Sequence, residues 1–216
     1  MLEVKLKAGC EALGLTLDDA QVGLLLTYIG LMDKWNRRFN LTAIRDPEAM
    51  VTRHILDSLA VLKHLPAGRV IDVGTGAGMP GVPLAIARPS QRVVVLDANG
   101  KKTRFLDHVV LTLGLQNVEV VNARVESFEP EKPFDAVISR AFTSLNAMIE
   151  TCVHLLTPDG LLLAMKGQYP AQELGTVSGN ARVCDVAEVV VPDLTEDRCL
   201  VIMAPIAPRT QECNEG

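Results

Sequence analysis

The chain has 216 residues, of which 48% are hydrophobic, and a formal net charge of −5, which suits one sizeable soluble domain with at most a modest appendage. The sequence shows neither the roughly 18-residue apolar run of a membrane span nor the apolar region of a signal peptide. Its five scattered cysteines and four histidines show no disulfide or metal-ligand pattern, so we expect a cytoplasmic protein without a metal. The negative charge lies mostly in residues 141–216, with four Lys/Arg against ten Asp/Glu, so an RNA partner is not excluded.

Residues 1–66 are predicted to form a helical region that packs on the rest of the chain. Thr16 is a candidate N-cap for a helix whose apolar side chains fall on one face: Val22, Leu25, Leu26, Ile29 and Met32. The polar and aromatic stretch 35–42 is predicted to be a loop. A second helical pattern follows Asp46 and Pro47, with a buried stripe formed by Met50, Ile55, Leu59 and Leu62.

Residues 67–216 are predicted to form a Rossmann-like α/β domain. Short β-rich runs alternate with helical ones, which indicates βαβ units and a mostly parallel sheet. Helices are expected near 81–88, 101–114 and 144–156, and residues 157–160 (TPDG) are expected to form a turn. Seven strands are expected, the last two as a terminal hairpin: 69–74, 92–97, 118–122, 134–139, 160–166, 182–191 and 198–204.

The segment 70–81 reads VIDVGTGAGMPG and is the most informative motif in the chain. It predicts a strand, a glycine loop and a helix start, an arrangement that lets backbone N–H groups approach a nucleotide-like ligand. Asp72 would repel a pyrophosphate, so we expect a cationic ligand, S-adenosylmethionine, held by Asp72, Gly74, Gly76 and Gly78. The literal G-x-G-x-x-G at 76–81 leaves an NAD(P)-dependent oxidoreductase as an alternative.

Further ligand-binding residues are expected where the other strands end, at the same edge of the sheet. Asp97 follows the second strand and is predicted to accept hydrogen bonds from ribose hydroxyls. Glu126 follows the third strand, where an adenine would lie. Arg140 and Lys166, after the fourth and fifth strands, are candidate phosphate contacts.

Other residues are candidates for contacting RNA. Phe142 follows the fourth strand and is a candidate for stacking on a base, although a core role is also open. Two basic pairs, Arg37–Arg38 and Lys101–Lys102, are candidate phosphate contacts, although such pairs are commonly solvated helix faces.

In five segments the chain resembles the bacterial ribosomal RNA small subunit methyltransferase G family, also called glucose-inhibited division protein B. The similarity covers roughly residues 20–175, and the tail beyond it matches only loosely. The first two segments are not general methyltransferase features, and from them we take Asn40, Arg53 and His54 as RNA-binding candidates. The segments are 39–42 (FNLT), 53–58 (RHILDS), 72–83, 96–97 with 101–102, and 139–141 with 166–167.

The resemblance implies methylation of N7 of a guanine in 16S rRNA near the decoding centre, on free RNA or on a small-subunit particle. It also implies cofactor contacts from Gly74, Met79, Val125, Glu126 and Arg140. Guanine N7 carries a lone pair and no proton, so no general base is expected, and the sequence offers no convincing His/Asp pair. A methyltransferase acting on a small molecule or on another RNA, and a non-catalytic RNA-binding module with the same fold, remain open alternatives.

Overall fold

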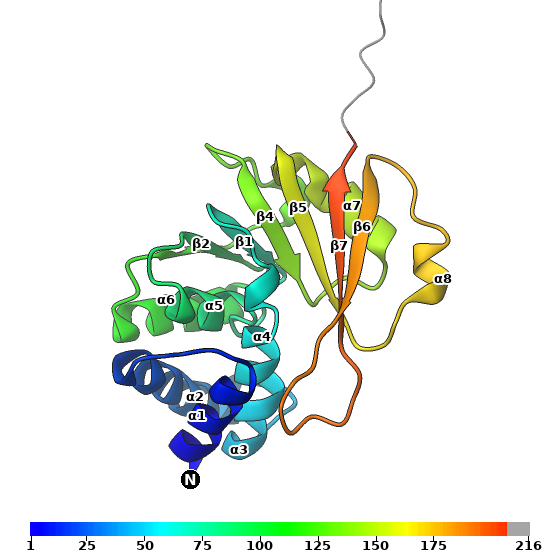
Figure 1. The fold of residues 1–216 in the computed structure, drawn as a ribbon. Coiled ribbons are helices and arrows are strands. Elements are labelled where there is room, and N and C mark those ends of the chain that lie inside the picture. The colour runs from blue at the N-terminus through cyan, green and yellow to red at the C-terminus, as the bar shows by residue number, and fades with distance from the viewer. Residues whose placement is uncertain (207–216) are drawn as a thin grey trace, which may run out of the picture.

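The computed structural model describes residues 1–206, and Cys213 lies outside this range. Its centre is a seven-stranded sheet with the strand order β3-β2-β1-β4-β5-β7-β6 (Figure 1). β7 pairs antiparallel with β5 and β6, whereas the other pairs are parallel. The predicted parallel core with a terminal hairpin is therefore confirmed. The strands are β1 (Val70–Val73), β2 (Val93–Leu96), β3 (Val118–Val121), β4 (Phe134–Ser139), β5 (Leu156–Lys166), β6 (Ala181–Glu188) and β7 (Cys199–Pro205).

Alternate residues of each strand face opposite sides of the sheet, and each side has its own core. Val70, Val95 and Ile138 pack towards the helices that precede and surround β1 and β2. Ile71 and Val137 pack on the other face. The first face is covered by α5 (Gly81–Ala87) and α6 (Gly100–Leu113), on which α2 (Asp19–Phe39) packs, with α1 (Leu2–Ala12) beyond it (Figure 1). The second face is covered by α7 (Leu145–Cys152), with the short α8 (Ala171–Leu174) beside it.

Helix α2 is longer than predicted and begins at a different cap. Asp18, and not Thr16, is the N-cap, and it forms a capping box with Gln21. The helix continues to Phe39, so the expected loop at 35–42 is wrong for its first five residues. Buried Asn36 explains the error, because its amide donates to the carbonyl of Ile44 and accepts from the N–H of Thr42. Asn36, a residue type common in loops, thus lies in the helix and holds the following loop in place by hydrogen bonds.

The second helical stretch is confirmed, but it is not a uniform α-helix. It consists of α3 (Pro47–Met50), a π-helical segment η1 (Val51–Leu56) and α4 (Asp57–Leu59), followed by the 3₁₀ turn η2 (Leu62–His64). π-helical segments inside helices are frequently associated with functional sites. Here the segment directly precedes Asp57, a buried carboxylate.

The predicted turn at 157–160 is wrong, because these residues lie inside β5. Leu156 pairs with Phe134 and Leu161 with Ala136, so the ladder between β4 and β5 has an irregularity that absorbs the extra residues. Gly160 is needed there, since a Cβ would lie 3.0 Å from the carbonyl oxygen of Phe134. The remaining short elements are the 3₁₀ turns η3 (Val125–Ser127) and η4 (Val153–Leu155).

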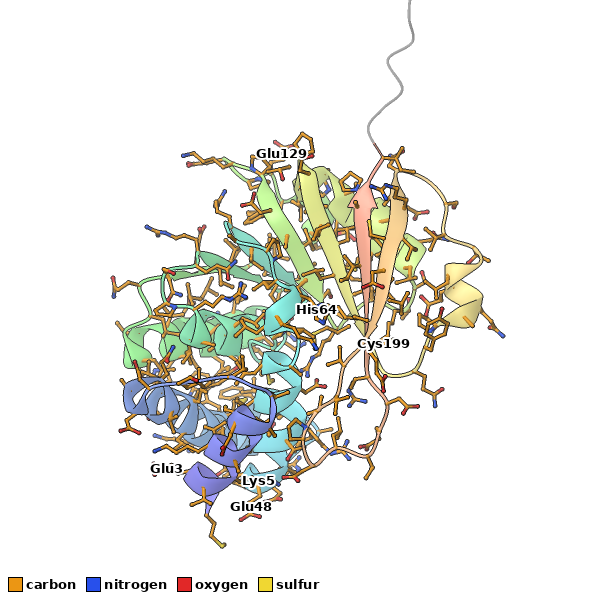
Figure 2. All side chains as sticks on the ribbon, viewed as in Figure 1. Glu3, Lys5, Glu48, His64, Glu129 and Cys199 are labelled. Atoms are coloured by element: carbon orange, nitrogen blue, oxygen red, sulfur yellow. The ribbon has the colours of Figure 1, made fainter. Side chains whose placement is uncertain are left out.

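The side chains fill the space between the sheet and its helices (Figure 2). Within residues 1–206, no helix is long and apolar enough to span a membrane, and no cluster of His, Cys, Asp and Glu has the makings of a metal site. Four cysteines in the same range are free thiols.

Candidate cofactor and substrate site

The loop between β1 and α5 is built from glycines in the left-handed region. Gly74, Gly76 and Gly78 have φ of 69°, 64° and 102°, which disfavours any side chain there. An added Cβ on Gly76 would meet nothing closer than Lys102 Nζ at 3.9 Å, whereas one on Gly78 would crowd Tyr28 and Leu106. The loop is therefore packed from beneath and open above Gly76.

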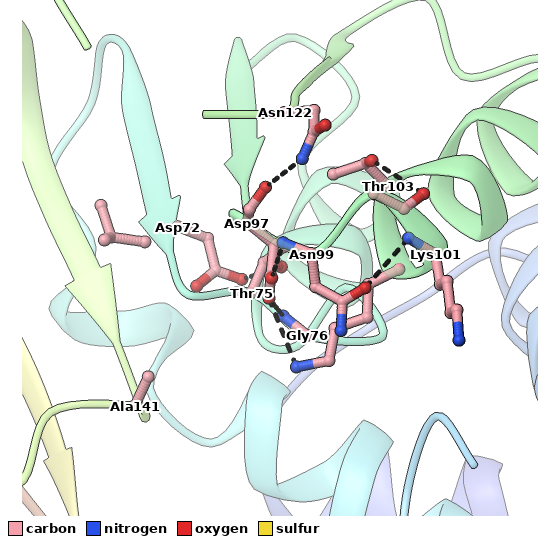
Figure 3. A network of polar contacts seen from close by, with 12 residues as sticks. Asp72, Thr75, Gly76, Asp97, Asn99, Lys101, Thr103, Asn122 and Ala141 are labelled. Carbon is pink, nitrogen blue, oxygen red and sulfur yellow. Dashed lines mark hydrogen bonds and ion pairs between the residues drawn. The ribbon is translucent and has the colours of Figure 1, made fainter. Parts of the chain in front are cut away.

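Asp72 lies beneath this loop and is fully buried. Its Oδ2 accepts a hydrogen bond from Thr75 Oγ1 at 2.6 Å (Figure 3). It accepts another from the N–H of Gly81 at 2.7 Å, so the carboxylate joins the loop to the start of α5. Its Oδ1 has no partner among the described residues. Burial raises the pKa of Asp72 to about 6. The sequence argument placed this carboxylate next to the ligand, and in the structure its hydrogen bonds go to the glycine loop and to the start of α5.

Asp97 follows β2 and connects three parts of the site (Figure 3). Its Oδ2 accepts from the N–H of Gly76 at 2.9 Å and lies 3.5 Å from Lys102 Nζ, while its Oδ1 accepts from the N–H of Asn99 at 2.8 Å. A carboxylate offers about four acceptor positions. The long contact to Lys102 is therefore the one that a ribose hydroxyl could replace.

Tyr28 supports the glycine loop from helix α2. The phenol is fully buried and donates a hydrogen bond to the carbonyl of Ala77. Burial raises its pKa, so the hydroxyl stays a donor. Met79, the next predicted contact, is also buried.

Val125 and Glu126 lie on η3, directly after β3. Val125 is largely buried and Glu126 is exposed. Asn122, just before them, donates to the carbonyl of Asp97 at 2.9 Å (Figure 3). The ends of β2 and β3 are thus held together, and both residues lie at the carboxyl edge of the sheet, as expected for an adenine-binding wall.

A second polar cluster lies beside the glycine loop. Asp57, which is 4% exposed, accepts from Arg140 Nη1 at 2.9 Å through Oδ2 and from Arg198 Nε at 2.9 Å through Oδ1. These residues come from α4, from the end of β4 and from the β6–β7 connection. An added Cβ on Gly74 would lie 2.7 Å from the Cβ of Ala141, the neighbour of Arg140. The carboxylate with its two arginines therefore adjoins the loop.

These residues line a hollow of about 400 Å³ that also includes Arg53, Lys166 and Gly167. Arg53 pairs with Glu196 from the β6–β7 connection. Lys166 Nζ lies 2.9 Å from Glu173 on α8 and 3.4 Å from the carbonyl of Phe142. Figure 2 labels Cys199, the first residue of β7, near this end of the sheet. The hollow is thus basic, and each of its cations is held by a carboxylate.

Two residues predicted to contact RNA have hydrogen-bond partners within the protein. His54 is buried, and its Nδ1 must donate to the carbonyl of Arg53, so that its Nε2 accepts from Thr42 Oγ1 at 2.8 Å. Burial lowers the pKa of His54 to about 4, which keeps the ring neutral. Asn40 ends α2 in the left-handed conformation, and its Oδ1 accepts from Arg45. Of the two, only His54 lines the hollow.

The basic pairs lie on the surface away from this hollow. Arg37 is bound to Asp33 one turn earlier at 2.8 Å. Arg38 and Lys101 are exposed and have no side-chain partner among residues 1–206. Lys102 points to Asp97, so the second pair divides between the cofactor site and the surface.

The chain matches the family described as rRNA small subunit methyltransferase G over residues 21–201. A protein of that name from Chromobacterium violaceum is 50% identical over 200 residues, which cover 92% of this chain and 96% of the relative. Another of that name, from Alteromonas mediterranea, is 48% identical, covering 93% and 95%.

The chain belongs to the rRNA small subunit methyltransferase G family. It is therefore a methyltransferase that uses S-adenosylmethionine, and the NAD(P)-dependent alternative is set aside. Solved structures support the fold alone: TrmN from Thermus thermophilus aligns with a TM-score of 0.54 at 18% identity, covering 79% of this chain and 53% of that one. The mitomycin 7-O-methyltransferase MmcR aligns with 0.56 at 14% identity, covering 84% and 66%.

The architecture of this methyltransferase fits its cofactor. The loop above Gly76 is open, Asp97 has a replaceable contact, and the buried Asp72 places a negative charge beneath the loop. These features suit a ribose and a cationic sulfonium better than a pyrophosphate.

Sequence reasoning missed three residues of this methyltransferase site. Tyr28 was not singled out, since a tyrosine on an apolar helix face carries no local signal of its distant partner. Asp57 lies within a family segment but was given no role. Arg198 lies in the part of the chain that matched the family only loosely, and its partner Asp57 is 141 residues away.

Proposed function

We propose that this protein methylates N7 of a guanine in 16S rRNA near the decoding centre, on free RNA or on a small-subunit particle in the cytoplasm. The observation that carries the proposal is the contact between Gly74 and Ala141, which places the basic hollow directly beside the glycine loop. A methyl donor bound above the loop and a nucleotide bound in the hollow would then meet at one point.

The proposed cofactor contacts follow the carboxyl edge of the sheet. Backbone at Gly74, Gly76 and Gly78 forms the floor beneath the methionine part, and Asp97 accepts from the ribose. Met79, Val125 and Glu126 border the adenine. Asp72 holds the loop and favours the cationic donor by its charge, while Arg140 borders the reacting end.

The reaction needs positioning more than proton transfer. S-adenosylmethionine supplies an activated methyl group, and guanine N7 supplies a lone pair without losing a proton. His54, the imidazole that borders the hollow lined by Arg53, Arg140 and Arg198, is neutral and hydrogen-bonded at both ring nitrogens, so we assign it no proton-transfer role. Alignment of the two reactants accounts for the rate enhancement that we expect.

The arginines of the hollow are suited to an RNA substrate. Arg140 and Arg198 each use part of a guanidinium on Asp57, and Arg198 Nη1 also donates to the carbonyl of Asp197 at 2.8 Å. The N–H groups that these bonds leave over can meet phosphate or base oxygens. The side chain of Lys166 is 13% exposed and is paired with Glu173, so we assign it to shaping the wall. A phosphate contact would require its release from that carboxylate. Phe142 is partly buried and packs on the second core, so its buried part serves the core while its exposed part remains a candidate for stacking on a base.

The test is methyl transfer from labelled S-adenosylmethionine to undermethylated small-subunit RNA, both naked and assembled, followed by mapping of the modified base. We expect label at one guanine, with loss of N7 reactivity there. Absence of label from both substrates, while the protein still binds S-adenosylhomocysteine, contradicts the RNA target and favours a small-molecule acceptor.

A further inference from the structure

Helices α2 and α6 form an exposed aromatic surface that the cofactor site does not use. Its members are Trp35, Phe39 and His108. The ring of Trp35 lies 5.2 Å from that of Phe39 and 5.4 Å from that of His108, centroid to centroid. Phe39 is 45% exposed, although it is apolar and lies at the end of a helix.

The base of this aromatic surface is rigid. Trp35 also packs on Phe105 at 5.5 Å, and Phe105 is fully buried and stacks on Tyr28. Tyr28 in turn holds the glycine loop through Ala77. Exposed Phe39 is therefore the outermost member of a continuous row of rings that leads inwards to the cofactor loop.

Positive charge surrounds the aromatic surface. Arg38 precedes Phe39, and Arg104 and Lys101 lie one and two turns before His108 on α6. All three are exposed, and none has an ion-pair partner within residues 1–206. Unpaired basic side chains around an exposed ring match the combination of stacking platform and phosphate contacts that binds unpaired nucleic acid.

Resting on the proposed function, we propose that the aromatic surface binds an unpaired nucleotide of the substrate RNA at a distance from the methylated guanine, with its base stacked on Phe39. Arg38, Lys101 and Arg104 contact the adjoining phosphates. Charge selects this occupant, because an apolar protein partner gains little from three unpaired cations at the edge of one ring.

The chain contains one tryptophan, which makes this surface easy to observe. We would titrate the protein with undermethylated small-subunit RNA in the presence of S-adenosylhomocysteine and follow the fluorescence of Trp35. Stacking on Phe39 should change this emission with the same apparent affinity as RNA binding measured by filter retention. Unchanged emission at saturating RNA overturns the proposal.

Variants separate stacking from packing. Phe39→Leu keeps an apolar side chain and should weaken RNA binding on the order of tenfold, whereas Phe39→Tyr should bind like the unaltered protein. Arg104→Gln should reduce the salt dependence of binding by about one counterion, whereas Arg182→Gln, an exposed arginine on edge strand β6, should not. Equal RNA affinity of Phe39→Leu and Phe39→Tyr overturns the stacking role.

The proposed function and this inference fail in different ways. If the unaltered protein transfers no methyl group to RNA, the proposed function fails. If it methylates RNA, binds S-adenosylhomocysteine equally well in all Phe39 variants, and loses no RNA affinity in Phe39→Leu, the aromatic surface alone is disproved.

Discussion

Tyr28 on α2 donates a hydrogen bond to the carbonyl of Ala77 in the glycine loop, across 49 residues of sequence. A helix that lies outside the expected Rossmann-like core thereby holds the loop that is proposed to bind the cofactor. The packing of α2 on α5 and α6 consequently supports the site. The division of the chain at residue 66 stays a prediction, since one apolar core runs through both parts.

Tyr28→Phe should lower the stability of the protein and its affinity for the cofactor. The change leaves the carbonyl of Ala77 without its donor in a buried place, which costs about 1–3 kcal/mol. Chemical denaturation and calorimetry with S-adenosylhomocysteine measure both effects. Tyr169→Phe is the matched control, because Tyr169 is 64% exposed and should tolerate the change. Equal behaviour of the two variants would contradict the supporting role of Tyr28.

Gly76→Val should abolish cofactor binding. At a φ of 64° a β-branched residue is strained by about 1–3 kcal/mol, and its side chain would project into the open space above the loop. Calorimetric titration with S-adenosylmethionine tests this. Gly30→Ala serves as the control, since Gly30 lies in α2 with open space around it and the change should be neutral or stabilising. Near-normal affinity of the valine variant would remove Gly76 from the site.

Cofactor affinity should fall as the pH is lowered from about 7.5 to about 5. Burial raises the pKa of Asp72 from 3.8 to about 6, so its ionisation opposes folding: its stabilising contribution is complete below about 3.8 and is lost as the pH rises through about 6. A cationic ligand favours the ionised form and therefore binds best above that range. Asp72→Asn should bind more weakly at pH 7.5 and lose the pH dependence. An Asn variant that keeps the same pH profile would assign the effect to another group.

Asp57→Asn should slow methyl transfer and lower stability by about 1–3 kcal/mol, because two part-exposed arginines lose their shared anion and repel one another. Single-turnover transfer and thermal unfolding measure these effects. Asp33→Asn breaks an exposed pair with Arg37 and should change stability by less than about 1 kcal/mol. If both variants transfer methyl at the unaltered rate, the Asp57 bridge has no part in positioning Arg140 and Arg198.

The sheet could be predicted because its signals are local. The apolar run 93–96 predicts a strand and the glycines of 74–78 predict a loop, and neither prediction needs information about distant residues. The sheet order follows from the family fold. The end of α2 could not be predicted in this way. Asn36 looks like a loop residue but holds the loop that follows the helix, and Trp35 packs on Phe105 of α6, a partner that the local sequence does not reveal.

The binding site, too, could be predicted only in part: residues at strand ends could be chosen from the sequence, whereas pairs of distant residues could not. Asp97 and Gly76 were chosen from strand ends, and the structure joins them by a 2.9 Å hydrogen bond. The pairing of Asp57 with Arg198 depends on the path of the β6–β7 connection, and residue spacing in the sequence does not predict that path. Lys166 was expected to face a ligand, but its strongest contact, Glu173, lies in a short helix that was not predicted.

The position of β7 between β5 and β6 also sets an order for the assembly of the sheet. β6 precedes β7 in the sequence but is joined to the sheet only through it, so β6 cannot pair with the sheet until β7 has been synthesised. Until the segment that begins at Arg198 has emerged from the ribosome, β5 keeps an open edge and Asp57 has only one of its two arginines, so the edge of the sheet and the charge bridge are completed together.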